Sequence, residues 1–328
     1  MTRATVVRRF TFGAAAAVFV LLFAGALVTS TESGLAVPDW PLSYGKVMPP
    51  MVGGIRFEHG HRLVAAAVST IVGIQIAVLL WGEKRKSVRR LGFLAFGAIL
   101  LQALLGGLTV LLLLPPFVST AHAALAEIVF ALTAVVALQT SRLFVGDAAL
   151  APAPELLRPV AAAAFRAAAL AAGVTYLQIL VGAVMRHTGA GLAVADFPLV
   201  SGRLLPSLSL LAKPGVPIHL AHRLGAVLVL VAVAVAVRRL AALEGLHPVF
   251  AKLSAAWVAL VTIQVMLGAM SIWSAKAPLV TAVHLATGAL LWVTAVVSCV
   301  LTAHAAKGTA APEIEAASPA PSALGATA

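Results

Sequence analysis

The sequence predicts an all-α membrane protein with eight transmembrane helices, arranged as two parallel four-helix bundle repeats. Three observations lead to this prediction. Apolar residues make up 61% of the 328 positions and charged residues only 10%, long apolar runs recur along the chain, and the two halves share motifs in the same order. Soluble globular domains carry about 25% charged residues, so the composition excludes that class of protein.

Each predicted helix rests on an uninterrupted apolar run. A helix needs about 20 such residues to cross roughly 30 Å of hydrocarbon, whereas spanning strands would alternate polar and apolar residues over about 10 positions. In the first half the runs cover residues 11–30, 57–81, 91–113 and 118–141. In the second half they cover residues 165–185, 218–237, 253–274 and 278–303.

An internal duplication explains the shared motifs. SGLAVPDWP at 33–41 matches AGLAVADFP at 190–198, and HRL at 61–63 matches HRL at 222–224. Four crossings are an even number, so both copies enter the membrane in the same orientation, as parallel repeats. We therefore predict four segments: a first repeat at 1–141, a cytoplasmic linker at 142–164, a second repeat at 165–304 and a disordered cytoplasmic tail at 305–328.

The net charge of +12 raises the question of a nucleic-acid partner. The basic residues are, however, sorted by side of the membrane. With the amino terminus inside, 15 of the 23 lysines and arginines fall on the inner side and six on the outer side, while Arg62 and Arg223 lie within helices. This asymmetry follows the positive-inside rule. We predict a multi-pass protein of the plasma membrane, with both termini cytoplasmic, in contact with the lipid bilayer and with no nucleic acid.

Four histidines form two pairs, each at the same place in one half. His61 and His122 are 61 residues apart, and His222 and His284 are 62 residues apart. Each lies a few residues inside the outer end of its apolar run, so the four imidazoles are expected at one depth. Ionisable groups in such runs are rare and commonly functional. Two facing helices per half would then present one imidazole each to the bundle core, where bundles build cofactor sites.

Paired neutral imidazoles suit the axial ligation of a haem iron. Zinc would need a third or fourth ligand, and each half offers only a carboxylate or one further histidine near one member. A lone histidine in such a helix is more often a core residue that hydrogen bonds to its neighbours. The repetition in register favours haem, with all four histidines as metal ligands.

An arginine follows one histidine of each pair, as Arg62 and Arg223. Beside an iron ligand near the membrane surface, a guanidinium can form two hydrogen bonds to a haem propionate. The alternative is an arginine that extends to the lipid headgroups.

The halves differ three residues before this histidine. Glu58 precedes His61 on the same helix face, and its counterpart before His222 is His219. This asymmetry suggests that one half acts on its ligand while the other only holds it. A carboxylate beside a bound macrocycle can accept a proton during oxidation. Alternatively, Glu58 only stabilises the start of its helix.

Other polar residues suggest structural roles. Gln102 and Gln264 match each other and are expected to form hydrogen bonds between helices. Asp39 and Asp196 are expected to brace the two long outer loops. Glu127 lies inward of His122, where a proton relay is one option.

Taken together, these motifs resemble the heme A synthase family, over about residues 10–304. The resemblance rests on TESGLAVPDWPLSYG followed by MPPM in the first outer loop, on the E-x-x-H-R run from Glu58 to Arg62, on the second H-R at His222, and on His122 and His284. The set is specific, although each motif alone is weak. Some relatives carry cysteine pairs in the outer loops; Cys299 is the sole cysteine here, so a disulfide of that kind is excluded.

The resemblance implies an oxidoreductase whose substrate is haem O. The ring methyl of haem O would be oxidised to a formyl group by successive hydroxylations, which gives haem A for cytochrome oxidase. The substrate would lie between His61 and His122, beside Glu58, and a resident haem b between His222 and His284. The remaining cofactor contacts would come from Arg62, Arg223 and His219. Implied partners are heme O synthase, which farnesylates haem, and cytochrome oxidase assembly factors; a homo-oligomer is compatible with the sequence.

Two rival functions remain open. A di-haem electron carrier linked to quinone would share the histidine pairs but would not need Glu58. Such a carrier more usually stacks its haems across the membrane, and the single level predicted here favours the enzyme. A transporter with parallel repeats would show broken apolar segments at matched midplane positions, and none is convincing.

Overall fold

The computed structural model describes residues 2–146 and 149–307, and the regular elements in this part of the chain are helices. Eight of them are long and apolar enough to cross a membrane, which confirms the predicted class and number of spans. They are α1 (Arg3–Ser30), α2 (Ile55–Gly82), α3 (Lys86–Leu111), α4 (Pro116–Gln139), α5 (Arg158–His187), α7 (Val216–Ala241), α8 (Val249–Trp273) and α9 (Pro278–Ala306). The short elements are η1 (Glu155–Leu157), η2 (Ala190–Leu192) and α6 (Leu208–Leu211).

The helices extend beyond the apolar runs that predicted them. α5 begins at Arg158 instead of residue 165, so the end of the predicted linker is helical. α9 continues to Ala306, so the predicted tail is helical at its start; residues 308–328 of that tail lie outside the described residues. An apolar run marks the hydrocarbon crossing, whereas backbone hydrogen bonding continues into the polar flanks until a residue stops it.

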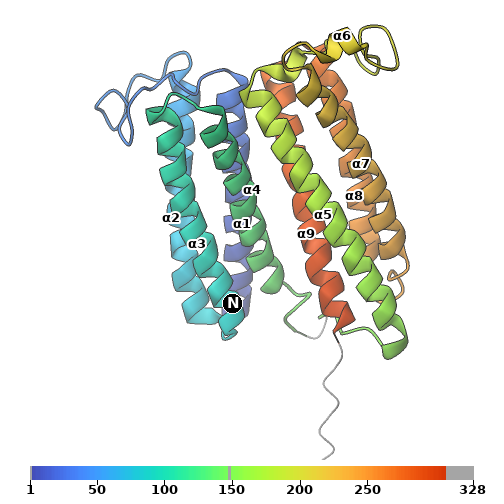
Figure 1. Cartoon of the computed structure of the whole chain (residues 1–328). Helices are drawn as coiled ribbons and strands as arrows, with labels where there is room; N and C mark the ends of the chain where they lie inside the picture. The colour runs from blue at the N-terminus through green and yellow to red at the C-terminus, as the bar shows by residue number, and fades with distance from the viewer. Residues whose placement is uncertain (1, 147–148, 308–328) are drawn as a thin grey trace, which may run out of the picture.

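The long helices pack as two rings of four (Figure 1). In the first half, α1 and α3 each pack against α2 and α4. In the second half, α5 and α8 each pack against α7 and α9. The histidine-bearing helices α2 and α4 therefore lie diagonally across one bundle, and α7 and α9 lie diagonally across the other. This equivalence supports the interpretation of the chain as a duplicated unit.

The two bundles meet along α1, α4, α5 and α9. The most buried of the eight spans is α9, which packs against α1 and α4 as well as its own half. Ala289 and Trp292 of α9 share one apolar core with Val18, Leu22 and Phe130 of the first half. Close packing of this kind holds membrane helices together, because the lipid provides no hydrophobic driving force.

The long outer loops 31–54 and 188–215 share one turn structure. Tyr44 and Gly45 have φ values of 53° and 70°, and Ser201 and Gly202 have values of 52° and 76°. Two successive residues with positive φ make the type I′ turn that joins antiparallel segments. Isolated bridges pair the residues around each turn, Ser43 with Lys46 and Val200 with Arg203.

Candidate functional site

The four predicted ligand histidines occupy equivalent places in their helices. Each of His61, His122, His222 and His284 is the seventh residue of its helix. At a rise of 1.5 Å per residue, each lies about 9 Å from the helix start. All four helices start at the end of the molecule that carries the outer loops (Figure 1). The structure thus places the four histidines at one level.

Within each half the two histidines come together. His61 lies within electrostatic range of His122, and His284 within range of His222. Because they stand on diagonal helices, each pair is contributed from opposite sides of its bundle. Each of the four rings has at least one nitrogen without a hydrogen-bond partner in the described residues. Such a nitrogen is the buried Nδ1 in His61, His122 and His284, whereas Nδ1 of His222 contacts Gln178. A buried unpaired nitrogen is unfavourable unless a ligand or a metal ion satisfies it.

A glycine on the adjacent helix makes room for each ring. Gly106 on α3 faces His122, and a Cβ built there would lie 2.9 Å from Cε1 of the ring. The same distance is 2.9 Å for Gly182 and His222, 3.1 Å for Gly25 and His61, and 3.3 Å for Gly268 and His284. A side chain at any of these positions would displace the imidazole. The close approach of backbone and ring therefore fixes where each histidine stands.

Three glutamines contact the same histidines. As predicted, Gln102 forms a hydrogen bond between helices: its amide nitrogen donates to the His122 carbonyl oxygen at 2.9 Å and lies 3.3 Å from Nε2 of that ring. Gln264 lies 3.5 Å from Nε2 of His284. Gln178 was not predicted. Its amide nitrogen donates to the His222 carbonyl oxygen at 2.7 Å and lies 3.0 Å from Nδ1 of the ring.

Glu58 and His219 both connect the start of a helix to an outer loop. The Glu58 carboxylate accepts the Val37 backbone N–H at 2.7 Å. Nδ1 of His219 lies 3.1 Å from the Ala190 carbonyl oxygen, to which it donates. Both side chains are buried, at 3% exposure. The equivalent positions thus share a structural role, although only Glu58 is acidic.

Arg62 and Arg223 fasten these loops over the bundles. Arg62 pairs with Glu58 at 2.6 Å and also donates to the backbone carbonyls of Val37, Asp39 and Leu42. Arg223 donates to the backbone carbonyls of Val194, Asp196 and Leu199. The sequence interpretation assigned these guanidiniums to a propionate or to lipid headgroups. It missed the loop contacts, because they depend on the path of each loop above its helix.

Asp39 and Asp196 brace the two type I′ turns, as predicted. The Asp39 carboxylate accepts the backbone N–H groups of Tyr44 and Gly45, at 2.6 and 2.8 Å. The Asp196 carboxylate accepts those of Ser201 and Gly202, at 2.9 and 2.8 Å. The N–H of Gly45 lowers the pKa of Asp39 below its usual value of 3.8, and the N–H of Gly202 does the same for Asp196. Both carboxylates are therefore charged at neutral pH.

Arg186 at the outer end of α5 was not predicted to contribute. Its guanidinium reaches the first half, where it donates to the Ser30 hydroxyl at 2.7 Å, and it lies within electrostatic range of His284. The next residue, His187, lies within range of His122. When the two repeats are aligned, Arg186 corresponds to Thr29 of the first half. The duplication therefore did not indicate that a cation lies at this position.

The geometry fits haem better than a bare metal ion. Among residues 2–146 and 149–307, no group of three His, Cys, Asp or Glu side chains could hold such an ion. A porphyrin supplies four nitrogen ligands of its own, so two opposed imidazoles complete the coordination of its iron. Two diagonal imidazoles per half, each with a free nitrogen, match that requirement.

Glu127 lies deeper in α4 and apart from these contacts. It is buried, at 3% exposure, and its Oε2 has no hydrogen-bond partner in the described residues. The Tyr176 hydroxyl of the second half lies within electrostatic range and donates to the Ala124 carbonyl oxygen at 3.2 Å. The structure therefore places Glu127 near the seam between the bundles.

Comparisons with known proteins agree with the interpretation of the histidine pairs as haem sites. The family model described as "COX15-CtaA: Cytochrome oxidase assembly protein" matches residues 8–53 and 55–296. The chain is 35% identical over 215 residues to a heme A synthase of Symbiobacterium thermophilum, which is 64% of this chain and 67% of the relative. It is 34% identical over 188 residues to a heme A synthase of Bacillus pumilus (56% and 59%), and 33% identical over 224 residues to one of Halalkalibacterium halodurans (66% and 70%). With a match over most of its length that includes all four histidines, the chain belongs to the COX15-CtaA family of cytochrome oxidase assembly proteins.

Proposed function

We propose that this protein is a heme A synthase, a membrane oxidoreductase that converts the ring methyl of haem O to the formyl group of haem A. The observation that carries the proposal is the pair of diagonal histidines at the same level in each bundle. Family membership supports it, as do the several relatives that bear this name.

His61 and His122 of the first half would hold the substrate haem O. Their rings stand on diagonal helices against Gly25 and Gly106, so the two imidazoles are presented from opposite sides of the bundle. Glu58 lies three residues before His61 on α2, and Arg62 and the Val37 N–H fix its position. A carboxylate oxygen has lone pairs beyond those used in these two bonds. Glu58 can therefore also accept a proton released during oxidation of the methyl group.

His222 and His284 of the second half would hold a resident haem b. Gln178 and Gln264 orient these rings, and His219 at the position of Glu58 offers no carboxylate. When bound, haem b supplies one-electron redox chemistry. The asymmetry supports the division of roles, because only the first half carries an acidic group beside its histidine.

The test is expression of the chain in a host that makes haem O but no haem A. Extracted pigments are separated by chromatography, and we expect the formyl product to appear. Glu58→Ala is expected to keep the b-type spectrum and lose the product. His222→Ala or His284→Ala is expected to deplete the b-type spectrum itself. Bound b-type haem without product would support the di-haem carrier instead, and loss of the spectrum in Glu58→Ala would reverse the assignment of the halves.

The proposal extends to location and partners. We infer a multi-pass plasma-membrane protein with both termini cytoplasmic, because basic residues are concentrated at the end of the bundle where α1 begins. Reporter fusions at each terminus and at residue 210 test this orientation. Heme O synthase and oxidase assembly factors are the expected partners, and crosslinking followed by mass spectrometry tests for them and for a homo-oligomer.

A further inference from the structure

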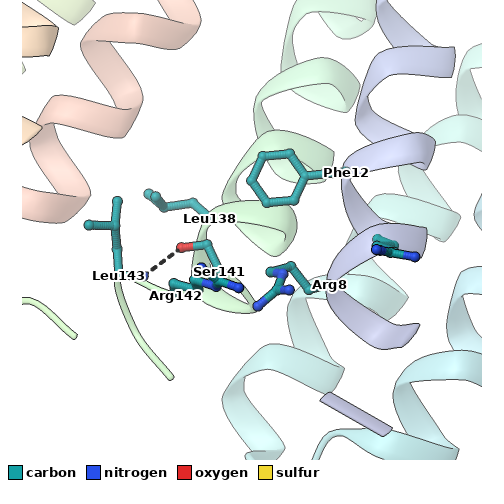
Figure 2. A pocket seen from close by; sticks show the side chains of 7 residues that line it. Arg8, Phe12, Leu138, Ser141, Arg142 and Leu143 are labelled. Atoms are coloured by element: carbon teal, nitrogen blue, oxygen red, sulfur yellow. Dashed lines mark hydrogen bonds between the residues drawn. The ribbon is translucent and has the colours of Figure 1, made fainter. Parts of the chain in front are cut away.

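A groove opens at the end of the bundle opposite the histidines, where α1 begins and α4 ends (Figure 2). It has a volume of about 480 Å³ and is lined mainly by arginines and apolar side chains. Arg8 and Phe12 come from α1, one helical turn apart and so on one face of that helix. Leu138 comes from α4, and Arg142 and Leu143 come from the segment that follows it.

The walls of this groove are fixed by hydrogen bonds. The hydroxyls of Thr11 and Thr140 lie 2.7 Å apart and join α1 to the end of α4, and both side chains are buried. The Ser141 hydroxyl accepts the Leu143 backbone N–H at 3.1 Å and turns the chain after α4, as the dashed line in Figure 2 shows. These two bonds hold α1, the end of α4 and the turn that follows it in place around the groove.

Two of the arginines that line it, Arg8 and Arg142, have no acidic partner among the described residues. The salt bridges in the described residues are Glu58 with Arg62 and Glu83 with Arg85, so neither Arg8 nor Arg142 forms an ion pair there. Arg9 lines the groove as well. Phe12 is 51% exposed beside these cations, whereas Leu138 is only 7% exposed and forms part of the floor.

We propose that this groove binds one anionic phospholipid. The phosphate would lie between Arg8 and Arg142, and an acyl chain would run over Phe12 toward the hydrocarbon. A polar anion and a long apolar chain on one molecule match the cationic rim and apolar wall, a combination that a soluble anion lacks. Basic sites between membrane helices are known to select anionic headgroups through such contacts. The groove volume also lies within the roughly 300–1,000 Å³ typical of small-molecule sites.

The test uses the full-length protein and native mass spectrometry after titration with phosphatidylglycerol, phosphatidylcholine or inorganic phosphate. We expect one phosphatidylglycerol to be retained by the intact protein in preference to phosphatidylcholine. The double variant Arg8→Gln, Arg142→Gln should weaken this binding roughly fivefold for each arginine removed. The matched control is Arg238→Gln, Arg239→Gln, which removes the same charge from the last turn of α7, outside the groove, and should bind as the unmodified protein does.

Three outcomes would overturn the proposal. Equal retention of both lipids by the unmodified protein would show that the groove does not select charge, and this measurement needs no variant to fold. Equal loss in the test and control variants would show a general effect of net charge. Displacement of phosphatidylglycerol by millimolar phosphate would show a simple anion site without use of the apolar wall.

Discussion

The guanidinium of Arg186 and the hydroxyl of Ser30 lie 2.7 Å apart and join the outer ends of α5 and α1. These are the first helices of the two halves, so the bond connects the bundles at their outer ends, beyond the glycines Gly25 and Gly182 that face the histidines. The same guanidinium also lies 3.4 Å from the Ala26 carbonyl oxygen. The contact links the two candidate sites structurally.

Removal of this contact is expected to weaken the packing of the two halves against each other and so to lower the stability of the protein. Arg186→Ala should lower the free energy of unfolding by about 1.5–3 kcal/mol, as is typical for a hydrogen bond to a charged group. Ser30→Ala removes only the acceptor and should have a smaller effect, because the Ala26 carbonyl remains. The midpoint of thermal unfolding in detergent measures both variants. Equal midpoints for Arg186→Ala and the unmodified protein would mean that the contact contributes nothing to stability.

Alanine at the glycines that face the histidines is expected to displace the rings. Gly106→Ala and Gly182→Ala would bring a Cβ to 2.9 Å from the ring, and overpacking of this kind typically costs about 1–3 kcal/mol. We expect each variant to lose haem from its own half only, measured as haem content per protein. Gly97→Ala on α3 and Gly173→Ala on α5 are matched controls, because nothing lies within 4 Å of a Cβ at either position. Loss of haem in the controls would point to a general effect on the helices.

Gln178 is expected to strengthen the binding of haem in the second half. Its amide contacts Nδ1 of His222 and leaves Nε2 free for iron. Loss of such a partner of a metal ligand typically reduces affinity about 10- to 100-fold. Gln178→Leu should therefore lower the retention of b-type haem during purification and leave the first half unaffected. Leucine is the natural residue at the corresponding position 21 of the first half, so the substitution is tolerated by a similar helix. Unchanged retention would contradict the positioning role.

The outer loops are expected to open in acid. Turn N–H groups lower the pKa of Asp39 and Asp196 in the folded protein below the ordinary value of 3.8. A lowered pKa means that the charged form stabilises the fold, so this stabilisation is complete at neutral pH and is lost as pH falls through the folded pKa. Trp40 fluorescence and proteolysis of residues 39–48 between pH 2 and 6 measure the opening. Asp39→Asn should remove the pH dependence of the first loop and leave that of the second.

The sequence predicted the parts of the site that depend on local spacing. The eight helices and the common level of the histidines follow from apolar runs and from the position of each histidine within its run, and the repeat shows which residues correspond. The roles of Asp39 and Gln102 were also recognised, because each has a counterpart in the other half.

The parts that were missed depend on which helices are neighbours. Gln178 and Arg186 have no counterpart in the first half, so the repeat gave no signal for them. The glycines opposite the histidines are recognisable only once α1 is known to pack on α2 and α3 on α4. The contacts of Arg62 depend on the path of a loop of more than 20 residues, and no local pattern determines that path.

The position of all four histidines at the seventh residue of their helices has an energetic consequence. A charge that moves between the two candidate sites would travel parallel to the bilayer plane. A transmembrane potential does about 2.3 kcal/mol of work per 100 mV on a unit charge that crosses the whole membrane, and none on one that moves sideways. Electron exchange between the halves should therefore proceed at the same rate in energised and in uncoupled cells.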